Sequence, residues 1–185
     1  MLKTSRIKLL GALAWIMGGI QPAIAGGAKR WITWPALASL TGGTDTAGVA
    51  GTRFTASLFI PHIVTLTGIG FLIGSVGGTD KAIVELHDAD GTLLANSALA
   101  GVTVGTAATM QEIPFTAPVE VVGPGWYFVS VTYNGITAKL RTMAAATAMA
   151  SVAITKSATG TFGTVGALTV PTTFTADVAP IAYTY

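Results

Sequence analysis

Hydrophobic and polar residues alternate most regularly over residues 126–133. One face of a strand with this period carries the larger apolar residues, Tyr127, Val129, Val131 and Tyr133. The other face is more polar and carries Trp126, Phe128, Ser130 and Thr132. Asn134-Gly135 follows, and these residues tolerate the positive φ of a type I′ turn. The pattern therefore predicts a β-hairpin in which residues 136–142 return beside residues 126–133, with Val131 opposite Ala138.

Shorter runs of the same kind predict further strands at residues 54–60, 62–74, 81–87, 93–95, 110–115, 119–122 and 151–155. Glycines 68 and 70 predict a bulge or bend in the second of these strands. In the third, the alternation places Ile83, Glu85 and His87 on the outward face. No segment has a convincing helical period. The chain is therefore expected to be an all-β protein, an antiparallel, jelly-roll-like β-sandwich with an extended apolar N-terminal arm.

The domain organisation follows from length and from the glycine-rich stretches. With 185 residues, the chain can form one well-buried core. We expect an N-terminal leader-like or docking arm and linker at residues 1–52, the sandwich at residues 53–158, and an extended tail at residues 159–185. The tail is expected to pack on the sandwich or on a neighbouring molecule.

Residues 1–25 have two interpretations. A basic start, the apolar run Leu9–Ile20 and the ending Ala23-Ile24-Ala25 are typical of a cleaved secretory leader. The same run could be an arm that docks on a partner. With about twelve residues it is shorter than the roughly 20 that a membrane-spanning helix needs, and we predict no membrane span.

Composition and charge narrow the classes of function. Only 10% of the residues are charged, whereas about 25% is usual in soluble domains. Such a surface favours permanent contact with other subunits, and we predict a homo-oligomer. Residues 31–185 hold five of the ten bases and all eight acids, a formal charge of −3, which disfavours nucleic acid as a partner. Cysteine is absent, which excludes disulfides and thiolate metal sites.

Residues with catalytic or metal-binding chemistry are sparse. His87 beside Glu85 is a weak metal candidate, and His62 lies on another predicted strand, so exposed strand histidines are the simpler interpretation. The sequence from Asp88 to Gly91 is typical of a turn, because Leu99 stands where a calcium loop would place its bidentate acid. No motif of a hydrolase, metalloprotease or nucleotide-binding protein occurs. We therefore predict no catalysis, no metal and no cofactor.

Aromatic residues are the remaining candidates for a binding role. Those suited to assembly or anchoring are Trp15, Trp31, Trp34, Phe174, Tyr183 and Tyr185. Trp31 and Trp34 could instead plug the chain's own sandwich. Trp126 and Phe128, two residues apart on the outward face, could stack against successive sugar rings, although packing beneath another sheet or subunit is the simpler interpretation.

From about residue 65 onward the chain resembles small β-sandwich proteins on the surface of tailed-phage virions, of the head-decoration or head-fibre kind. The resemblance lies in GIGFLIGSVGGTDKAIVELHDADG (68–91), NSALAG (96–101), EIPF (112–115), GPGWYFVSVTYNGITAKLR (123–141) and FGTVGALTVPTTFTADVAPIAYTY (162–185). It implies a multicopy, often trimeric structural protein without catalysis, located on the virion surface in contact with other virion proteins. The alternative is an exported cell-surface or glycan-binding module with a cleaved leader.

Overall fold

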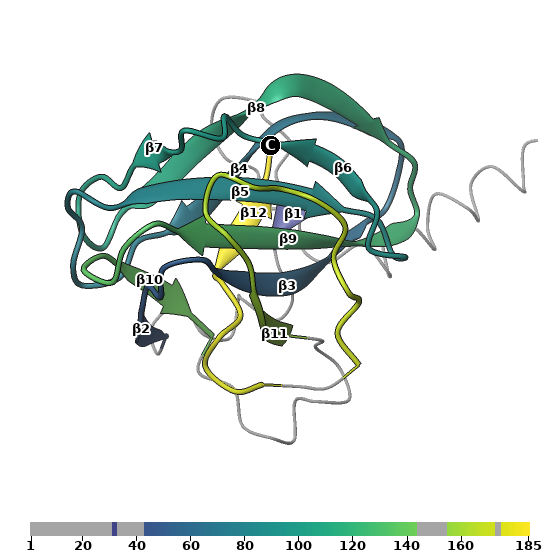
Figure 1. The fold of residues 1–185 in the computed structure, drawn as a ribbon. Helices are drawn as coiled ribbons and strands as arrows, with labels where there is room; N and C mark the ends of the chain where they lie inside the picture. The colour runs from purple at the N-terminus through teal and green to yellow at the C-terminus, as the bar shows by residue number, and fades with distance from the viewer. Residues whose placement is uncertain (1–30, 33–42, 144–154, 173–174) are drawn as a thin grey trace, which may run out of the picture.

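The computed structural model describes residues 31–32, 43–143, 155–172 and 175–185. These residues form strands, turns and coil without any helix, and every strand pair is antiparallel. The prediction of an all-β protein is confirmed, and the arrangement is consistent with a β-sandwich (Figure 1).

Twelve strands make up the described fold. They are β1 (Trp31–Ile32), β2 (Thr44–Ala47), β3 (Thr52–Ile60), β4 (Val64–Leu72), β5 (Lys81–His87), β6 (Leu93–Asn96), β7 (Val102–Thr103), β8 (Met110–Val121), β9 (Gly125–Tyr133), β10 (Lys139–Thr142), β11 (Thr155–Thr159) and β12 (Ala182–Thr184). One sheet has the order β1-β12-β4-β8, and a larger one has the order β11-β3-β9-β5-β6, with β7 also on β5. A two-stranded sheet joins β10 to β2.

The hydrophobic core lies between the two large sheets. The larger sheet contributes the inward side chains of β9 that the alternation predicts, together with Leu58 of β3 and Leu86 of β5. The four-stranded sheet contributes Leu66 and Phe71 of β4 and Ile113 of β8, among others. All of these side chains are buried, which is the main stabilising contribution that the hydrophobic pattern predicts.

The predicted hairpin after β9 is wrong. β9 is bordered by β3 on one side and β5 on the other, so neither edge of it is free to pair with a returning strand. β10 pairs instead with β2 and makes an isolated bridge from Leu140 to Ile73, just beyond β4. Neither Asn134 nor Gly135 has a positive φ, which excludes a type I′ turn.

A buried carboxylate explains the path that the chain takes instead. Asp80 Oδ2 accepts hydrogen bonds from the backbone N–H groups of Thr137 and Ala138, both at 2.7 Å. Asn134 prolongs the pairing with β5, because its Oδ1 accepts a hydrogen bond from Lys81 N at 2.7 Å. A Cβ at Gly135 would collide with the Asp80 carboxylate, so glycine is required here for close approach and not for its φ. The segment 134–138 is therefore a corner built around Asp80.

The strands predicted at residues 54–60, 62–74, 81–87 and 93–95 lie close to their expected positions. Of the strand predicted at residues 151–155, all but the last residue lies outside the described residues, and β11 begins at Thr155. β4 shows a register shift against β8 between Leu66 and Gly68, which confirms the expected irregularity. The turn between β5 and β6 is also confirmed, with Asp88 Oδ1 accepting from the N–H groups of Asp90 and Thr92. Residues 110–115 and 119–122 were expected as two strands but belong largely to the single strand β8, because both parts pair with β4.

The outward face of the larger sheet is buried, contrary to the sequence prediction. Side chains expected in water on β5 and β9 are almost fully covered, namely Ile83, Glu85, His87, Phe128, Ser130 and Thr132. The cause is the segment of residues 160–172, which we call the C-terminal strap. It carries no regular strand, and in Figure 1 its yellow-green coil passes in front of β5, β9 and β3.

Tyr133, the last residue of β9, places a polar group inside the core. Its ring lies 6.2 Å from that of Phe71, and its hydroxyl is buried with no hydrogen-bond partner. Burial, with a further contribution from the negative charge of Asp80, raises the pKa of Tyr133 above its ordinary value. The phenol therefore stays neutral in the folded protein at alkaline pH.

We expect Tyr133→Phe to raise the free energy of unfolding by about 1 kcal/mol, because it removes an unsatisfied buried hydroxyl. Urea denaturation at neutral pH measures this change. Above pH 10, the ordinary pKa of the tyrosine side chain, the unfolded chain loses this proton and the folded chain keeps it. The wild type should therefore lose stability above that pH more steeply than the variant.

The control for this variant is Tyr127→Phe. The Tyr127 hydroxyl donates to Val122 O at 2.7 Å, so its removal should destabilise by about 1 kcal/mol. Equal effects of the two substitutions would contradict the environment described for Tyr133.

Candidate docking surface

One end of the molecule carries a group of exposed apolar side chains. Ile63, Val122 and Trp126 are 59%, 66% and 48% exposed, respectively. The ring of the half-buried Phe59 lies 5.3 Å from the Trp126 indole at an interplanar angle of 58°. We call these four residues the end patch.

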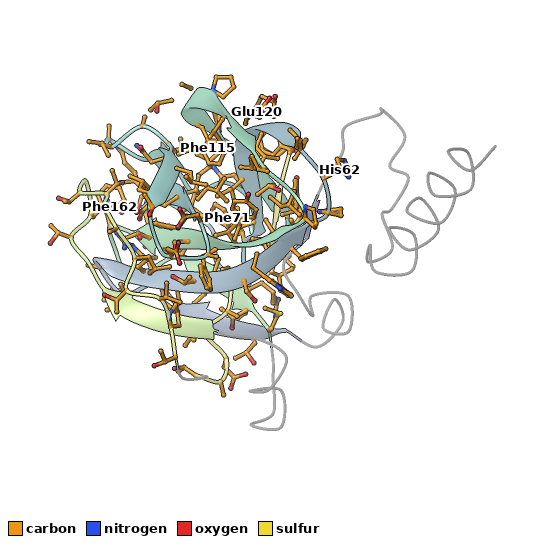
Figure 2. The ribbon with its side chains drawn as sticks, turned by 90° about the vertical axis from the view of Figure 1, so that its right-hand side faces the viewer. His62, Phe71, Phe115, Glu120 and Phe162 are labelled. Carbon is orange, nitrogen blue, oxygen red and sulfur yellow. The ribbon has the colours of Figure 1, made fainter. Side chains whose placement is uncertain are left out.

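The strand register brings the end patch together. Ile63 lies in the connection from β3 to β4, and Val122 in the connection from β8 to β9. The two connections touch, because a Cβ at Gly123 would collide with the backbone of His62. Trp126 is opposite Phe59 in the β3–β9 pair. In Figure 1 this is the right-hand end of the ribbon, and Figure 2 looks onto it and labels His62 and Glu120.

Three acidic residues lie at the same end of the molecule as the end patch: the half-buried Asp88 and the exposed Asp90 and Glu120. Glu120 pairs with Thr65 at the start of β4, and the turn that carries Asp88 and Asp90 follows His87, which is opposite Phe128. The Lys and Arg side chains that the structure describes lie towards the other end, near the corner at residues 134–138 or on β10; they are Arg53, Lys81, Lys139 and Arg141. The patch end is thus apolar at its centre and acidic at its rim.

The C-terminal strap is held on the sheet by two polar side chains. His87 Nε2 lies 3.0 Å from Gly166 O and Arg53 Nη1 lies 3.4 Å from Ala167 O. Because a carbonyl oxygen only accepts, His87 carries its hydrogen on Nε2. Leu168 is buried, and its N–H donates to Gly91 O at 2.8 Å.

The Glu85 carboxylate lies next to both of these side chains. Glu85 Oε2 lies 3.0 Å from Arg53 Nη2 and 3.5 Å from His87 Nε2. No donor is aligned on this oxygen for a hydrogen bond, so its contact with Arg53 is an ion pair. The Arg53 side chain is 12% exposed and the Glu85 side chain is 2% exposed. The cluster lies beneath the strap and acts on the strap's backbone, which indicates a structural role.

The structure separates the two residues of the predicted sugar platform. Trp126 is exposed, whereas Phe128 is only 4% exposed because the strap crosses its face of the sheet. The burial of Phe128 argues against a two-residue sugar platform and agrees with the simpler interpretation that this face is packed. Trp126 has Phe59 as its aromatic neighbour instead.

The tyrosines near the C-terminus contact the chain's own sheet. Tyr183 and Tyr185 lie on β4 where Gly70 and Gly68 leave room for their rings, and a Cβ at either glycine would collide with them. Tyr183 also donates a hydrogen bond to Glu112 Oε1 at 2.8 Å. These contacts explain the two glycines that the sequence singled out in this strand.

Among the predicted tryptophan anchors, the structure describes the backbone of Trp31. It lies in β1, opposite Thr184 of the chain's own β12. Trp15, Trp34 and Phe174 lie outside the described residues, and the assembly role of all these aromatics stays a prediction.

The predicted exposed histidines have different surroundings. His62 is exposed beside the end patch, whereas His87 is fully buried beneath the strap, which corrects its prediction. Within the described residues no group of three or more His, Cys, Asp or Glu side chains could hold a metal ion. The same part of the chain contains no helix long and apolar enough to cross a membrane.

Sequence reasoning missed the importance of Arg53, Ile63 and Val122. Ile63 and Val122 are apolar residues in short connections that contain Pro61 and Pro124. An apolar residue in such a connection was the only sequence feature that could have indicated their exposure. Arg53 gave no signal, because its partner Glu85 is not on an adjacent strand. No protein-family model and no curated protein matches the chain.

Proposed function

We propose that this protein is a structural component of a tailed-phage virion, a capsid decoration or head-fibre protein that acts without catalysis through contacts between many copies. The observation that carries the proposal is the end patch. Three large apolar side chains, 48%, 59% and 66% exposed, lie at one end of a chain of which only 10% is charged. Exposed apolar side chains gathered at one place on a surface mark sites of protein contact.

The contacts of the buried and paired carboxylates support the same proposal, because they stabilise the fold. Asp80 binds backbone N–H groups, Glu85 binds Arg53, and Asp45 lies 3.1 Å from Arg141. These groups stabilise corners, the strap and a two-stranded sheet. The resemblance to virion surface proteins, the jelly-roll-like arrangement and the N-terminal docking arm belong to this proposal as well.

Sedimentation velocity of the full-length protein tests the proposal. We expect one discrete multimer, for example a trimer, that persists on dilution to low micromolar concentration. A monomer over the whole concentration range would contradict a function that depends on contacts between copies.

A second candidate is an exported cell-surface or glycan-binding module. It is favoured by the exposed Trp126 indole, which offers an aromatic surface beside Phe59. This candidate requires a mature chain that starts at Gly26. Intact-mass measurement on the native protein separates the two functions, because the virion protein should retain Lys3 and Lys8.

A further inference from the structure

The direction of β1 relates the N-terminal arm to the end patch. Trp31 and Ile32 pair with Thr184 and Tyr183, which in turn pair with Ile69 and Gly70 of β4. Because both pairings are antiparallel, β1 runs in the same direction as β4. The chain therefore enters β1 from the end where β4 begins, which is the end that carries Ile63.

The connecting segment is long enough to reach that surface. Six residues of β4 and its preceding connection separate the level of Ile69 from Ile63, about 20 Å at the rise of a strand. Residues 21–30 lie between the apolar run Leu9–Ile20 and Trp31, and ten residues span up to about 33 Å when extended. The run can therefore reach the end patch of its own molecule or that of an adjacent one.

The chemistry of the arm complements that of the patch. Leu9–Ile20 has no charged residue and contains Trp15, so it matches the apolar centre. Its flanks carry five bases, Lys3, Arg6, Lys8, Lys29 and Arg30, and no acid. The rim of the patch carries Asp88, Asp90 and Glu120. Apolar surface thus meets apolar surface, and opposite charges meet around it.

We propose that the apolar run Leu9–Ile20 of one copy docks on the end patch of a neighbouring copy, with its flanking bases against the acidic rim. The inference rests on the proposed multicopy function. Among the described residues, Ile63, Val122 and Trp126 keep 48–66% of their surface exposed, which leaves the end patch available to a neighbouring copy.

Disulfide trapping between copies tests this docking directly, because the chain contains no cysteine. One preparation carries a single cysteine in the arm, in three versions, Ala12→Cys, Ala14→Cys and Ile16→Cys, which sample different positions along the run. The other preparation carries Ile63→Cys. After mixing and mild oxidation, we expect a disulfide-linked dimer of one chain of each kind for at least one version.

The matched control is Ile136→Cys. Ile136 is 69% exposed in the corner at residues 134–138, at the other end of the molecule. It should not cross-link with any arm cysteine. Equal cross-linking at positions 63 and 136 would show random collision and would overturn the inference.

The affinity between copies gives a second readout. Ile63→Ser should raise the dissociation constant of the multimer by about tenfold or more, the effect of losing one well-buried anchor, and Ile136→Ser should leave it unchanged. Added salt should weaken the wild-type contact, because it screens the attraction between the bases of the arm and the acids of the rim.

The outcomes separate this inference from the function on which it rests. A stable multimer without links to position 63 overturns the docking and leaves the multicopy function intact. A third preparation carries an arm cysteine and Ile63→Cys in the same chain. If it links within itself while the two single-cysteine preparations do not link, the arm docks on its own molecule and the inference is overturned. A protein that is monomeric at every concentration overturns the proposed function itself.

Discussion

Replacing Glu85 with alanine should lower the free energy of unfolding by about 3–5 kcal/mol, the usual effect of removing one partner from a buried ion pair. Arg53 would keep its charge beneath the strap without the carboxylate, and His87 would lose the group beside its Nε2 atom. Urea denaturation measures the loss. Limited proteolysis should also cut the C-terminal strap earlier than in the wild type.

Two further variants control for this effect. Arg141→Ala breaks the Asp45–Arg141 pair, whose side chains are both 27% exposed, and should cost at most about 1 kcal/mol. The double variant Arg53→Met with Glu85→Leu removes both buried charges and should recover much of the loss. Equal losses for Glu85→Ala and Arg141→Ala would contradict the burial of the Glu85 cluster.

Replacing Asp80 with alanine should cost about 3 kcal/mol or more. The two backbone N–H groups of Thr137 and Ala138 would lose a charged acceptor at a site where water has little access. Hydrogen bonds to charged groups contribute about 1.5–3 kcal/mol each. Urea denaturation measures the change, and hydrogen exchange at these two amides should speed up well before the core exchanges.

Asp88→Ala is the matched comparison for the Asp80 variant. Asp88 also accepts two backbone N–H groups, but in an exposed turn where water can replace it, so the expected loss is about 1 kcal/mol. A larger loss at Asp88 than at Asp80 would mean that the corner at residues 134–138 does not depend on the carboxylate.

The sequence predicted most of the longer strands, because apolar and polar residues alternate along them. It did not predict the short strands β1, β2, β7 and β12. It failed at Asn134-Gly135, where the local signal for a hairpin turn is strong. Pairing of β9 with β3 and β5 and the contacts of the distant Asp80 determine the path there. Contacts between residues far apart in the chain produce no periodic pattern in the sequence, so they could not be predicted from it.

The same limit applies to the candidate surface. The polar alternation of β5 and β9 indicated an exposed face, yet the strap, far along the chain, covers that face. The sequence placed Trp126 and Phe128 together on the outward face, and only Trp126, near the start of β9, is exposed. Ile63 and Val122 became part of the end patch only through the register of the connections that carry them.

Native mass spectrometry of the full-length protein tests the central claim most directly, because one spectrum gives both the number of copies and the mass of each chain. A virion structural protein should appear as a discrete multimer of chains that retain residues 1–25. A monomer whose mass begins at Gly26 would contradict the account.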